Sequence, residues 1–304
     1  MPGIANSAAI VSTPGIVSID GIITPLEGAT VSVLDRGFQY GDAVFEALRT
    51  YRGQADALDQ HLARLEHSCA LLHMEIGVTR AALREEVERA IAALDAPERY
   101  VRIMVTRGDR PESLPPMHRG APPVARRVVL VRPLGPSPSA LYEQGIRVMS
   151  CTAPPSPLWA GAKPTAYLNN LLAIGQAQRA GCDDALLLGA HGELLEGATS
   201  SLFLVRDGVL YTPPLSLGIL PGITRDRVLA CAAASGIEAR EKLLHIHDAY
   251  RADELFFTSS VRLLVAVVEV DGVRVADGAP GPVTRRVDAA YRAEIDILQQ
   301  ARKP

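Results

Sequence analysis

The sequence is poor in lysine. Its 304 residues include 28 arginines but only three lysines, at positions 163, 242 and 303. Arginine cannot act as an amine nucleophile, because its guanidinium group stays protonated and delocalised at any working pH. Lysine can, and Lys163 lies in the mostly apolar stretch Trp159–Pro164, just ahead of an apolar helical run. Composition bias alone would explain the scarcity, but so would a lysine kept for covalent chemistry such as a Schiff base.

Other features missing from the sequence exclude whole classes of partner. The net charge is only -3 and no basic stripe is present, which argues against nucleic acid as a partner. No apolar run approaches the roughly 20 residues that span a bilayer, so we expect no membrane partner. Residues 1–15 lack the basic start of a signal peptide. We therefore expect a cytoplasmic protein with a flexible tail over residues 1–15.

Cysteine and histidine give no sign of a metal site or a disulfide framework. The four cysteines are scattered without a C-x-x-C spacing, so they are predicted to be buried, reduced thiols. The seven histidines also lack a ligand pattern. His61 and His67, on one predicted helix, are expected to be packing or surface residues because no third ligand is evident. No metal is predicted.

The length and composition predict two domains. Hydrophobic residues make up 48% of the chain and charged residues 21%, an ordinary globular balance, and 304 residues exceed one small core. The Pro- and Ser-rich segment 133–139 has the composition of an interdomain linker. We expect a small domain over residues 16–132 and a large domain over residues 140–304. A site between two such halves is the default expectation.

Signals for strands and for helices are mixed along the chain. Asp-Gly steps at 20–21, 207–208 and 271–272 lie between β-rich runs and predict hairpins. Strands are predicted at Thr30–Leu34, Tyr100–Val105, Arg127–Val131, Gly145–Met149, Ala185–Leu188, Ser201–Val205, Val209–Tyr211, Leu255–Thr258 and Val265–Val270. Helices are predicted at Leu58–His73, Arg80–Leu94, Tyr167–Ala180, Thr224–Ala234 and Val283–Gln299. The hairpins argue against a regular βαβ repeat, so the predicted fold class is α+β (mixed α/β).

Three short segments could bind a phosphorylated ligand. The loop Leu220–Asp226 opens a helix, where free amides and the helix dipole attract anions, although Thr224 could instead be only an N-cap. Ser259-Ser260-Val261 follows an apolar strand and could complete an anion cradle. Arg64 could add the countercharge, or simply be a surface helix arginine. Glu196-Gly197 is either a polar turn or a carboxylate beside a flat ligand.

In this order along the chain, these motifs resemble the fold-type IV pyridoxal-phosphate enzymes. That family contains branched-chain aminotransferases, D-amino acid transaminases, aminodeoxychorismate lyases and (R)-selective amine transaminases. The resemblance runs from about Ile16 to Ile297 and implies a two-domain fold, with a small N-terminal α/β domain and a larger C-terminal β-barrel-like domain with helices. Its six matches are Asp35–Glu46, His61-x-x-Arg64-Leu65, Lys163, Glu196-Gly197-Ala198, Leu220–Arg225 and Gly281–Thr284.

The resemblance implies pyridoxal 5′-phosphate as the cofactor and gives individual residues roles around it. Lys163 would form the Schiff base and move the substrate proton, which requires a lowered amine pKa. Glu196 would pair with the pyridine nitrogen and keep it protonated. Tyr167 would lie near the phenolic oxygen of the cofactor. The implied phosphate-binding residues are Arg64, Ile223, Thr224, Ser260 and Val261.

The resemblance divides at the substrate. Family branched-chain enzymes bind the α-carboxylate with a Tyr-x-Arg pattern, which Tyr100-Val101-Arg102 matches. D-amino acid transaminases share the pattern of Asp35–Glu46 and of Thr106-Arg107-Gly108. Their Arg-x-His carboxylate trap is missing, because Glu112 and Leu114 stand in its place. The implied substrate-binding residues are Arg36, Tyr40, Tyr100 and Arg102, with Arg107 and Arg110 as further candidates for the carboxylate.

Our first hypothesis from the sequence is a transaminase that moves an amino group between an amino acid, a D-amino acid in the first instance, and a 2-oxo acid such as 2-oxoglutarate or pyruvate. A branched-chain L-amino acid aminotransferase is the nearest alternative, supported by Tyr40 and Tyr100-x-Arg102. An aminodeoxychorismate lyase, to some of which Ser260-Val261-Arg262 is similar, an (R)-amine transaminase and a non-catalytic phosphate-ligand binder are the others. The resemblance also implies a homodimer whose pockets are completed by the partner chain.

Overall fold

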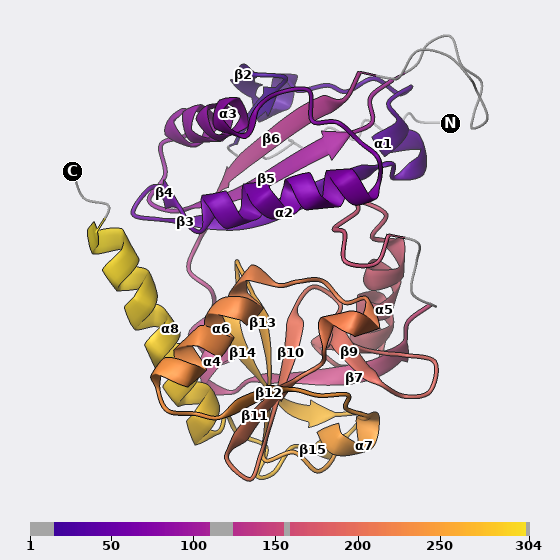
Figure 1. The fold of residues 1–304 in the computed structure, drawn as a ribbon, viewed down its shortest axis with the longest axis vertical. Helices are drawn as coiled ribbons and strands as arrows, with labels where there is room; N and C mark the ends of the chain where they lie inside the picture. The colour runs from indigo at the N-terminus through magenta and orange to yellow at the C-terminus, as the bar shows by residue number, and fades with distance from the viewer. Residues whose placement is uncertain (1–14, 110–123, 155–158, 302–304) are drawn as a thin grey trace, which may run out of the picture.

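The computed structural model describes residues 15–109, 124–154 and 159–301, which form two sheets, one above the other in Figure 1. The N-terminal sheet has six strands in the order β2-β1-β6-β5-β3-β4. All of its strand pairs are antiparallel. The strands are β1 (Ile16–Ile19), β2 (Ile22–Pro25), β3 (Ala43–Tyr51), β4 (Gln54–Ala55), β5 (Arg99–Thr106) and β6 (Arg126–Pro133).

Two amphipathic helices cover one face of this sheet, α2 (Leu58–Leu71) and α3 (Arg80–Ala92). The buried positions of α2 recur every three or four residues, as a helix with one apolar face requires, and they form a core with the inner side of the strands. A short helix, α1 (Arg36–Tyr40), leads into β3, and its N-cap Asp35 accepts a hydrogen bond from the amide of Gly37. One 3-10 turn, η1 (Leu26–Gly28), follows β2.

The second sheet has nine strands and is strongly curled. Its order is β12-β11-β10-β13-β14-β7-β8-β9, with β15 paired to β14. Although β9 ends this order, a bridge between Gly197 and Ser200 brings it beside β10. The strands are β7 (Ile146–Thr152), β8 (Asp184–Leu188), β9 (Leu194–Gly197), β10 (Ser201–Arg206), β11 (Val209–Thr212), β12 (Ala239–Glu241), β13 (Glu254–Ser259), β14 (Leu263–Val270) and β15 (Val273–Arg274).

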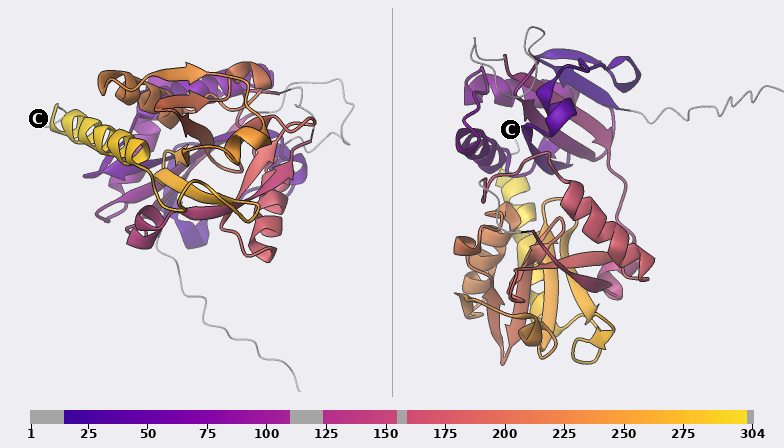
Figure 2. Two further views of the ribbon diagram at one scale, coloured as in Figure 1. Left: turned by 90° about the horizontal axis from the view of Figure 1, so that it is seen from below. Right: turned by 90° about the vertical axis from the view of Figure 1, so that its right-hand side faces the viewer.

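Helices pack on both sides of the curled sheet (Figure 2). Helix α5 (Leu168–Arg179) lies against β7 and β8, whereas α6 (Ile223–Ala234) and α8 (Pro282–Ala301) contact each other and β13. The shorter elements are α4 (Ser139–Glu143), η2 (Leu215–Leu217) and α7 (Ile246–Ala249).

The Gly281–Thr284 motif has a structural role. Buried Glu254, the first residue of β13, accepts hydrogen bonds from the amides of Val283 and Thr284 at 2.9 and 2.7 Å and from the Thr284 hydroxyl at 2.7 Å. It thereby caps the start of α8, where backbone amides have no acceptor within the helix. A Cβ atom on Gly281 would overlap the Glu254 carboxyl group, so glycine is required there.

The predicted fold class is confirmed, and so are the three Asp-Gly hairpins and the five longer helices. The strand predicted at Thr30–Leu34 is wrong: no strand forms there, and Val31, Val33 and Leu34 are exposed, because no neighbouring strand offers backbone partners to this run. Strand β3 was not predicted from the sequence, although it pairs with β5 along seven residues.

The prediction of four buried cysteines is half wrong. Cys69 and Cys231 are buried, but Cys151 and Cys182 are partly exposed, and all four are free thiols. His61 is buried and His67 exposed, as packing and surface residues should be. Among the described residues, no three histidine, cysteine, aspartate or glutamate side chains are grouped so as to hold a metal ion. No helix in the same part of the chain is long and apolar enough to cross a membrane.

The hairpin between β10 and β11 allows a test of its turn. Gly208 has a φ of +76° and no atom near the place of a Cβ, so Gly208→Ala adds only backbone strain. We expect it to lower the free energy of unfolding by about 1 kcal/mol, the usual penalty for left-handed backbone in a non-glycine residue. Gly135→Ala is the control, since Gly135 has equal space and no positive φ. Equal urea midpoints for the two variants would contradict the turn geometry.

Candidate active site

A cavity of about 1070 Å³ lies between the two halves of the molecule. The N-terminal half contributes side chains from β3, α2 and β5, and the C-terminal half contributes the loop before α5, the end of β9, the start of α6 and the β13–β14 turn. The cavity contains most of the residues singled out from the sequence. These are Arg64, Tyr100, Arg102, Lys163, Tyr167, Glu196, Ile223, Thr224, Ser260 and Val261.

Lys163 extends into this cavity from the loop before α5. Its Nζ lies 3.5 Å from the hydroxyl of Tyr167 and 4.5 Å from the centre of the Phe45 ring. Burial lowers the pKa of the Lys163 amine to about 8, and the charges of Glu46 and Glu196 only partly oppose that effect. The neutral amine, which is the nucleophilic form, is therefore far better populated at neutral pH than in an ordinary lysine.

Glu196 lines the cavity from the end of β9. Its Oε2 accepts one long hydrogen bond, 3.4 Å, from the amide of Leu220. Burial raises the pKa of the Glu196 carboxyl to about 7, despite that bond and the cationic Lys163 and Arg64. A carboxyl group in this state gains strongly from a cationic nitrogen placed beside it.

Arg64 is fixed by a buried carboxylate. Its Nε and Nη2 donate to the two oxygens of Glu46 at 2.8 and 2.7 Å, and its Nη1 donates to the Pro221 carbonyl at 2.8 Å. The Nδ1 of His61 lies 2.7 Å from the same carboxylate. Burial acts to raise the pKa of Glu46, but Arg64 and His61 outweigh it and lower that pKa to about 2. Glu46 therefore remains ionised and holds the guanidinium at the cavity edge.

The start of α6 and the β13–β14 turn lie beside Arg64. Gly222, not Thr224, is the N-cap of α6, so the N-cap alternative for Thr224 is wrong. Thr224 is buried in the first turn of the helix and lines the cavity. The first amides of a helix have no acceptor within it and can receive an anion. In the turn, the Ser260 hydroxyl lies 3.4 Å from Nε2 of His61.

These donors fit the phosphate and the ring of pyridoxal 5′-phosphate. A guanidinium, helix-start amides and a serine hydroxyl form a set that suits a dianion. The buried hydroxyls of Ser200 and Thr258 have no hydrogen-bond partner within the described residues, and both line the cavity. A Cβ atom on Gly197 would overlap the Ser200 hydroxyl, and one on Gly222 would overlap the Ser201 hydroxyl. The two glycines therefore leave room for these hydroxyls in the cavity wall. Residues that would hold the ring are Lys163, Tyr167 and Glu196.

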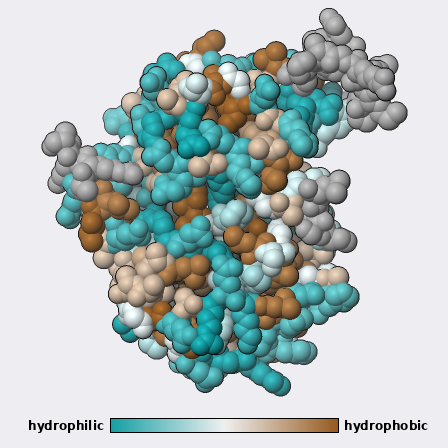
Figure 3. Space-filling view, viewed as in Figure 1, coloured by the Kyte–Doolittle hydropathy of each residue, from teal (hydrophilic) through white to brown (hydrophobic). Residues whose placement is uncertain are grey.

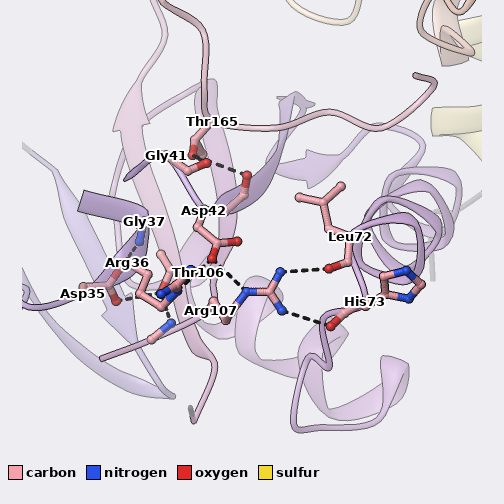
Figure 4. Close-up of polar contacts among 12 residues, drawn as sticks. Asp35, Arg36, Gly37, Gly41, Asp42, Leu72, His73, Thr106, Arg107 and Thr165 are labelled. Carbon is pink, nitrogen blue, oxygen red and sulfur yellow. Dashed lines mark hydrogen bonds and ion pairs between the residues drawn. The ribbon is translucent and has the colours of Figure 1, made fainter. Parts of the chain in front are cut away.

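The arginines considered for a substrate carboxylate differ in their partners. Arg36 and Arg107 both donate to Asp42, at 2.9 and 2.8 Å, and Arg107 also donates to the carbonyls of Leu72 and His73 (Figure 4). Neither of these two arginines lines the cavity. The side chain of Arg102 forms no ion pair or hydrogen bond with any residue that the structure describes, and its guanidinium lies 3.8 Å above the Phe45 ring at the cavity wall.

The remaining candidates do not meet in this cavity. Arg36 and Tyr40, on α1, do not line it, and Tyr40 is 47% exposed. Arg110, Glu112 and Leu114 lie outside the described residues. Arg262, the residue that suggested a lyase, reaches the cavity but donates to Asp184 at 2.8 Å and Thr199 at 3.0 Å.

Sequence reasoning gave no role to Phe45 or Glu46, the two residues that organise the cavity wall. Phe45 lies against the side chains of Lys163, Arg102 and Tyr167. Phe45 and Glu46 are the last two residues of the Asp35–Glu46 motif. The feature of the sequence that could have identified Glu46 is its carboxylate among apolar neighbours. A buried carboxylate needs a cationic partner, but the sequence does not say which arginine or histidine supplies it.

The state of Glu196 can be tested by unfolding the cofactor-free chain. A carboxyl whose folded pKa is raised from 4.5 to about 7 contributes stability that is full below pH 4.5 and is lost as pH rises through about 7. Glu196→Gln removes that loss, so it should be more stable than the parent at pH 8 by about 1–2 kcal/mol, allowing for water in the cavity, and nearly equal at pH 5. Denaturant titrations at both pH values measure this difference. Exposed Glu143→Gln is the control, and a pH-independent difference would refute the raised pKa.

Known proteins resemble this chain along nearly its whole length. Residues 43–270 match the family described as amino-transferase class IV. A putative branched-chain-amino-acid aminotransferase of Methanocaldococcus jannaschii is 36% identical over 279 residues, covering 91% of this chain and 95% of the relative. A D-alanine aminotransferase of Bacillus licheniformis is 28% identical, with coverages of 92% and 96%. The crystal structure of the branched-chain aminotransferase of Escherichia coli superimposes with a TM-score of 0.86 at 30% identity, over 92% of this chain and 94% of that one.

The matched segment contains Arg64, Lys163, Glu196 and the start of α6, and it makes up most of the chain. Class IV aminotransferases use pyridoxal 5′-phosphate, which the donors of the cavity fit. The chain therefore belongs to the class IV aminotransferases and is a pyridoxal-phosphate-dependent aminotransferase.

Proposed function

We propose that this aminotransferase moves the amino group of branched-chain L-amino acids to a 2-oxo acid. The free guanidinium of Arg102 in the cavity is the observation that carries the proposal. With Tyr100 on the same strand it forms the Tyr-x-Arg pair implied for branched-chain enzymes, and Tyr100 also lines the cavity. The similarity to branched-chain aminotransferases supports the same substrate class.

In the proposed mechanism, Arg102 binds the α-carboxylate of the substrate. A guanidinium without a protein partner can offer two parallel N–H donors to a carboxylate. Its stacking on Phe45 holds the guanidinium in place without using those donors. Apolar side chains that also line the cavity, among them Trp159, Leu217 and Ile219, suit a branched aliphatic side chain.

The proton transfers fall to Lys163. Its amine has a pKa lowered to about 8 and can accept the α-proton of the substrate at Nζ. It can then donate a proton to the carbon that the amino nitrogen joins on the cofactor side. Tyr167, 3.5 Å away, receives a hydrogen bond from this amine and limits where it points. Glu196 would pair with the pyridine nitrogen of the bound cofactor, whose positive charge favours the ionised carboxylate. The bound cofactor supplies the electron sink for this chemistry.

A D-amino acid transaminase is the second candidate. It is favoured by the Asp35–Glu46 and Thr106-Arg107-Gly108 patterns and by the similarity to a D-alanine aminotransferase over 92% of the chain. Against it, Arg36 and Arg107, the arginines of these two patterns, pair with Asp42 and do not line the cavity.

We also propose that the chain acts as a homodimer in the cytoplasm. Phe38 on α1 and Leu168 and Leu171 on α5 are largely exposed, and Ala166, just before α5, lies close to Gly41 at the end of α1. Figure 3 shows apolar side chains among polar ones on one face, several of them near the level where the halves meet. A second copy would cover apolar surface of this kind.

The first test is the half-reaction of purified, cofactor-loaded protein with L-leucine and, separately, with D-alanine. We expect L-leucine to abolish the visible absorbance band of the loaded enzyme and D-alanine to leave it in place. Lys163→Ala is the control and should show no steady-state turnover, because no other lysine among the described residues lines the cavity. Loss of the band with D-alanine alone would replace our proposal by the second candidate.

A second test concerns the carboxylate. Arg102→Ala should raise KM for L-leucine by roughly ten- to a hundredfold and change kcat less, because it removes charge-assisted hydrogen bonds that substrate and transition state share. Steady-state kinetics measure the split. The matched control is Arg132→Gln, an exposed arginine on the neighbouring strand β6, outside the cavity. An unchanged KM in the Arg102 variant would rule out this carboxylate site.

A further inference from the structure

The backbone of Lys163 is attached to the N-terminal sheet, although its neighbours in sequence belong to the C-terminal half. The Phe45 amide donates to the Lys163 carbonyl at 2.9 Å, and the Thr165 amide donates to the Ala43 carbonyl at 2.8 Å. Between them, Val44 and Pro164 form an antiparallel bridge. The lysine loop thus runs beside the start of β3 as a short additional strand.

Two side chains reinforce this attachment. The Thr165 hydroxyl donates to the Gly41 carbonyl at 3.2 Å, a contact visible in Figure 4. The second is Ser68 on α2, whose Oγ accepts a hydrogen bond from the Lys163 amide at 3.1 Å. Ser68 is fully buried and does not line the cavity. It lies four residues after Arg64, on the same side of α2.

Within the described part of the chain, Ser68 is the one acceptor of the Lys163 amide. Its carbonyl is held by Phe45, and the next residue is proline, which has no amide hydrogen to donate. Without the Ser68 oxygen, the Lys163 amide would lose this acceptor, and the loop would keep the bonds to β3 and to Gly41. A lysine side chain has four rotatable bonds, so the point where it leaves the backbone largely decides where its amine can reach.

We propose that Ser68 is a positioning residue of this aminotransferase, which fixes the backbone of Lys163 so that its amine stays between Tyr167 and Phe45. The inference rests on the proposed role of Lys163 as the reactive lysine. Ser68 touches neither the cavity nor the amine, so it acts only through the Lys163 amide. A serine that served stability alone would leave the behaviour of the amine unchanged.

The scarcity of lysine makes the amine directly measurable. Acetic anhydride acylates only neutral amines, and mass spectrometry can follow Lys163 and exposed Lys242 as separate peptides in one sample of the cofactor-free, full-length chain. In the parent, acylation of Lys163 should reach half of its maximum near pH 8. In Ser68→Ala the midpoint should move to higher pH, because a displaced amine is better hydrated. The acylation of exposed Lys242 in the same sample corrects for changes in the reactivity of the anhydride with pH.

The same variant should lose turnover. We expect kcat with L-leucine to fall roughly ten- to a hundredfold, as for a misplaced catalytic group, while KM stays within about twofold. Ser68→Thr keeps the hydroxyl and should retain both the acylation midpoint and kcat. Ser18→Ala is the matched control: Ser18 is equally buried in the same half, and its hydroxyl donates to Glu86 at 2.8 Å, remote from the cavity.

A parent-like acylation midpoint and kcat in Ser68→Ala would overturn the proposal, as would an equal loss in Ser18→Ala. If Ser68→Ala does not fold, Ser68→Cys replaces it, because a thiol is a weak acceptor of similar size; an unshifted midpoint there overturns the proposal too. If the acylation midpoint shifts in Ser68→Ala but the parent protein turns over no amino acid, the role of Ser68 is sustained and the proposed function is rejected.

Discussion

The site depends on one buried carboxylate. Glu46 is completely inaccessible to solvent and would be too costly to bury alone, so it requires the guanidinium of Arg64 and the hydrogen bond with His61. Through them it aligns α2 with β3, sets the guanidinium at the cavity edge, and brings His61 to Ser260 of the opposite half. The Arg64 contact with the Pro221 carbonyl extends the same network to the loop before α6. Polar contacts made by Arg64 and His61 therefore join the two halves at the edge of the cavity.

Much of this arrangement could be predicted from the sequence, because its signals are local. The Asp-Gly steps specify tight turns wherever they stand, since Asp and Gly tolerate positive φ. The apolar faces of α2 and α3 appear as a helical period. Lys163 and Glu196 could be singled out because each is of an unusual type for its surroundings. Each of these inferences needs only the residue and its near neighbours in the chain.

What could not be predicted depends on partners distant in sequence. The run Thr30–Leu34 has strand-like residues but no neighbour to pair with, whereas β3 is a strand because β5 lies beside it. Arg36, Arg102 and Arg107 look alike in the sequence. They differ in the structure because Asp42 engages two of them and leaves the third free. Likewise, the sequence does not show why residue 281 is glycine. The reason is visible only in the folded chain, where the Glu254 carboxyl group occupies the place of a Cβ atom.

The attachment of the lysine loop to the first sheet also bears on the folding of the chain. Lys163 receives its backbone partners from residues made more than 90 positions earlier, but the burial that lowers its pKa comes from both halves. Until the second sheet has closed over the loop, Lys163 is an ordinary, protonated lysine and unreactive toward aldehydes. The lowered pKa of the Lys163 amine is therefore a property of the folded chain as a whole, which neither half provides by itself.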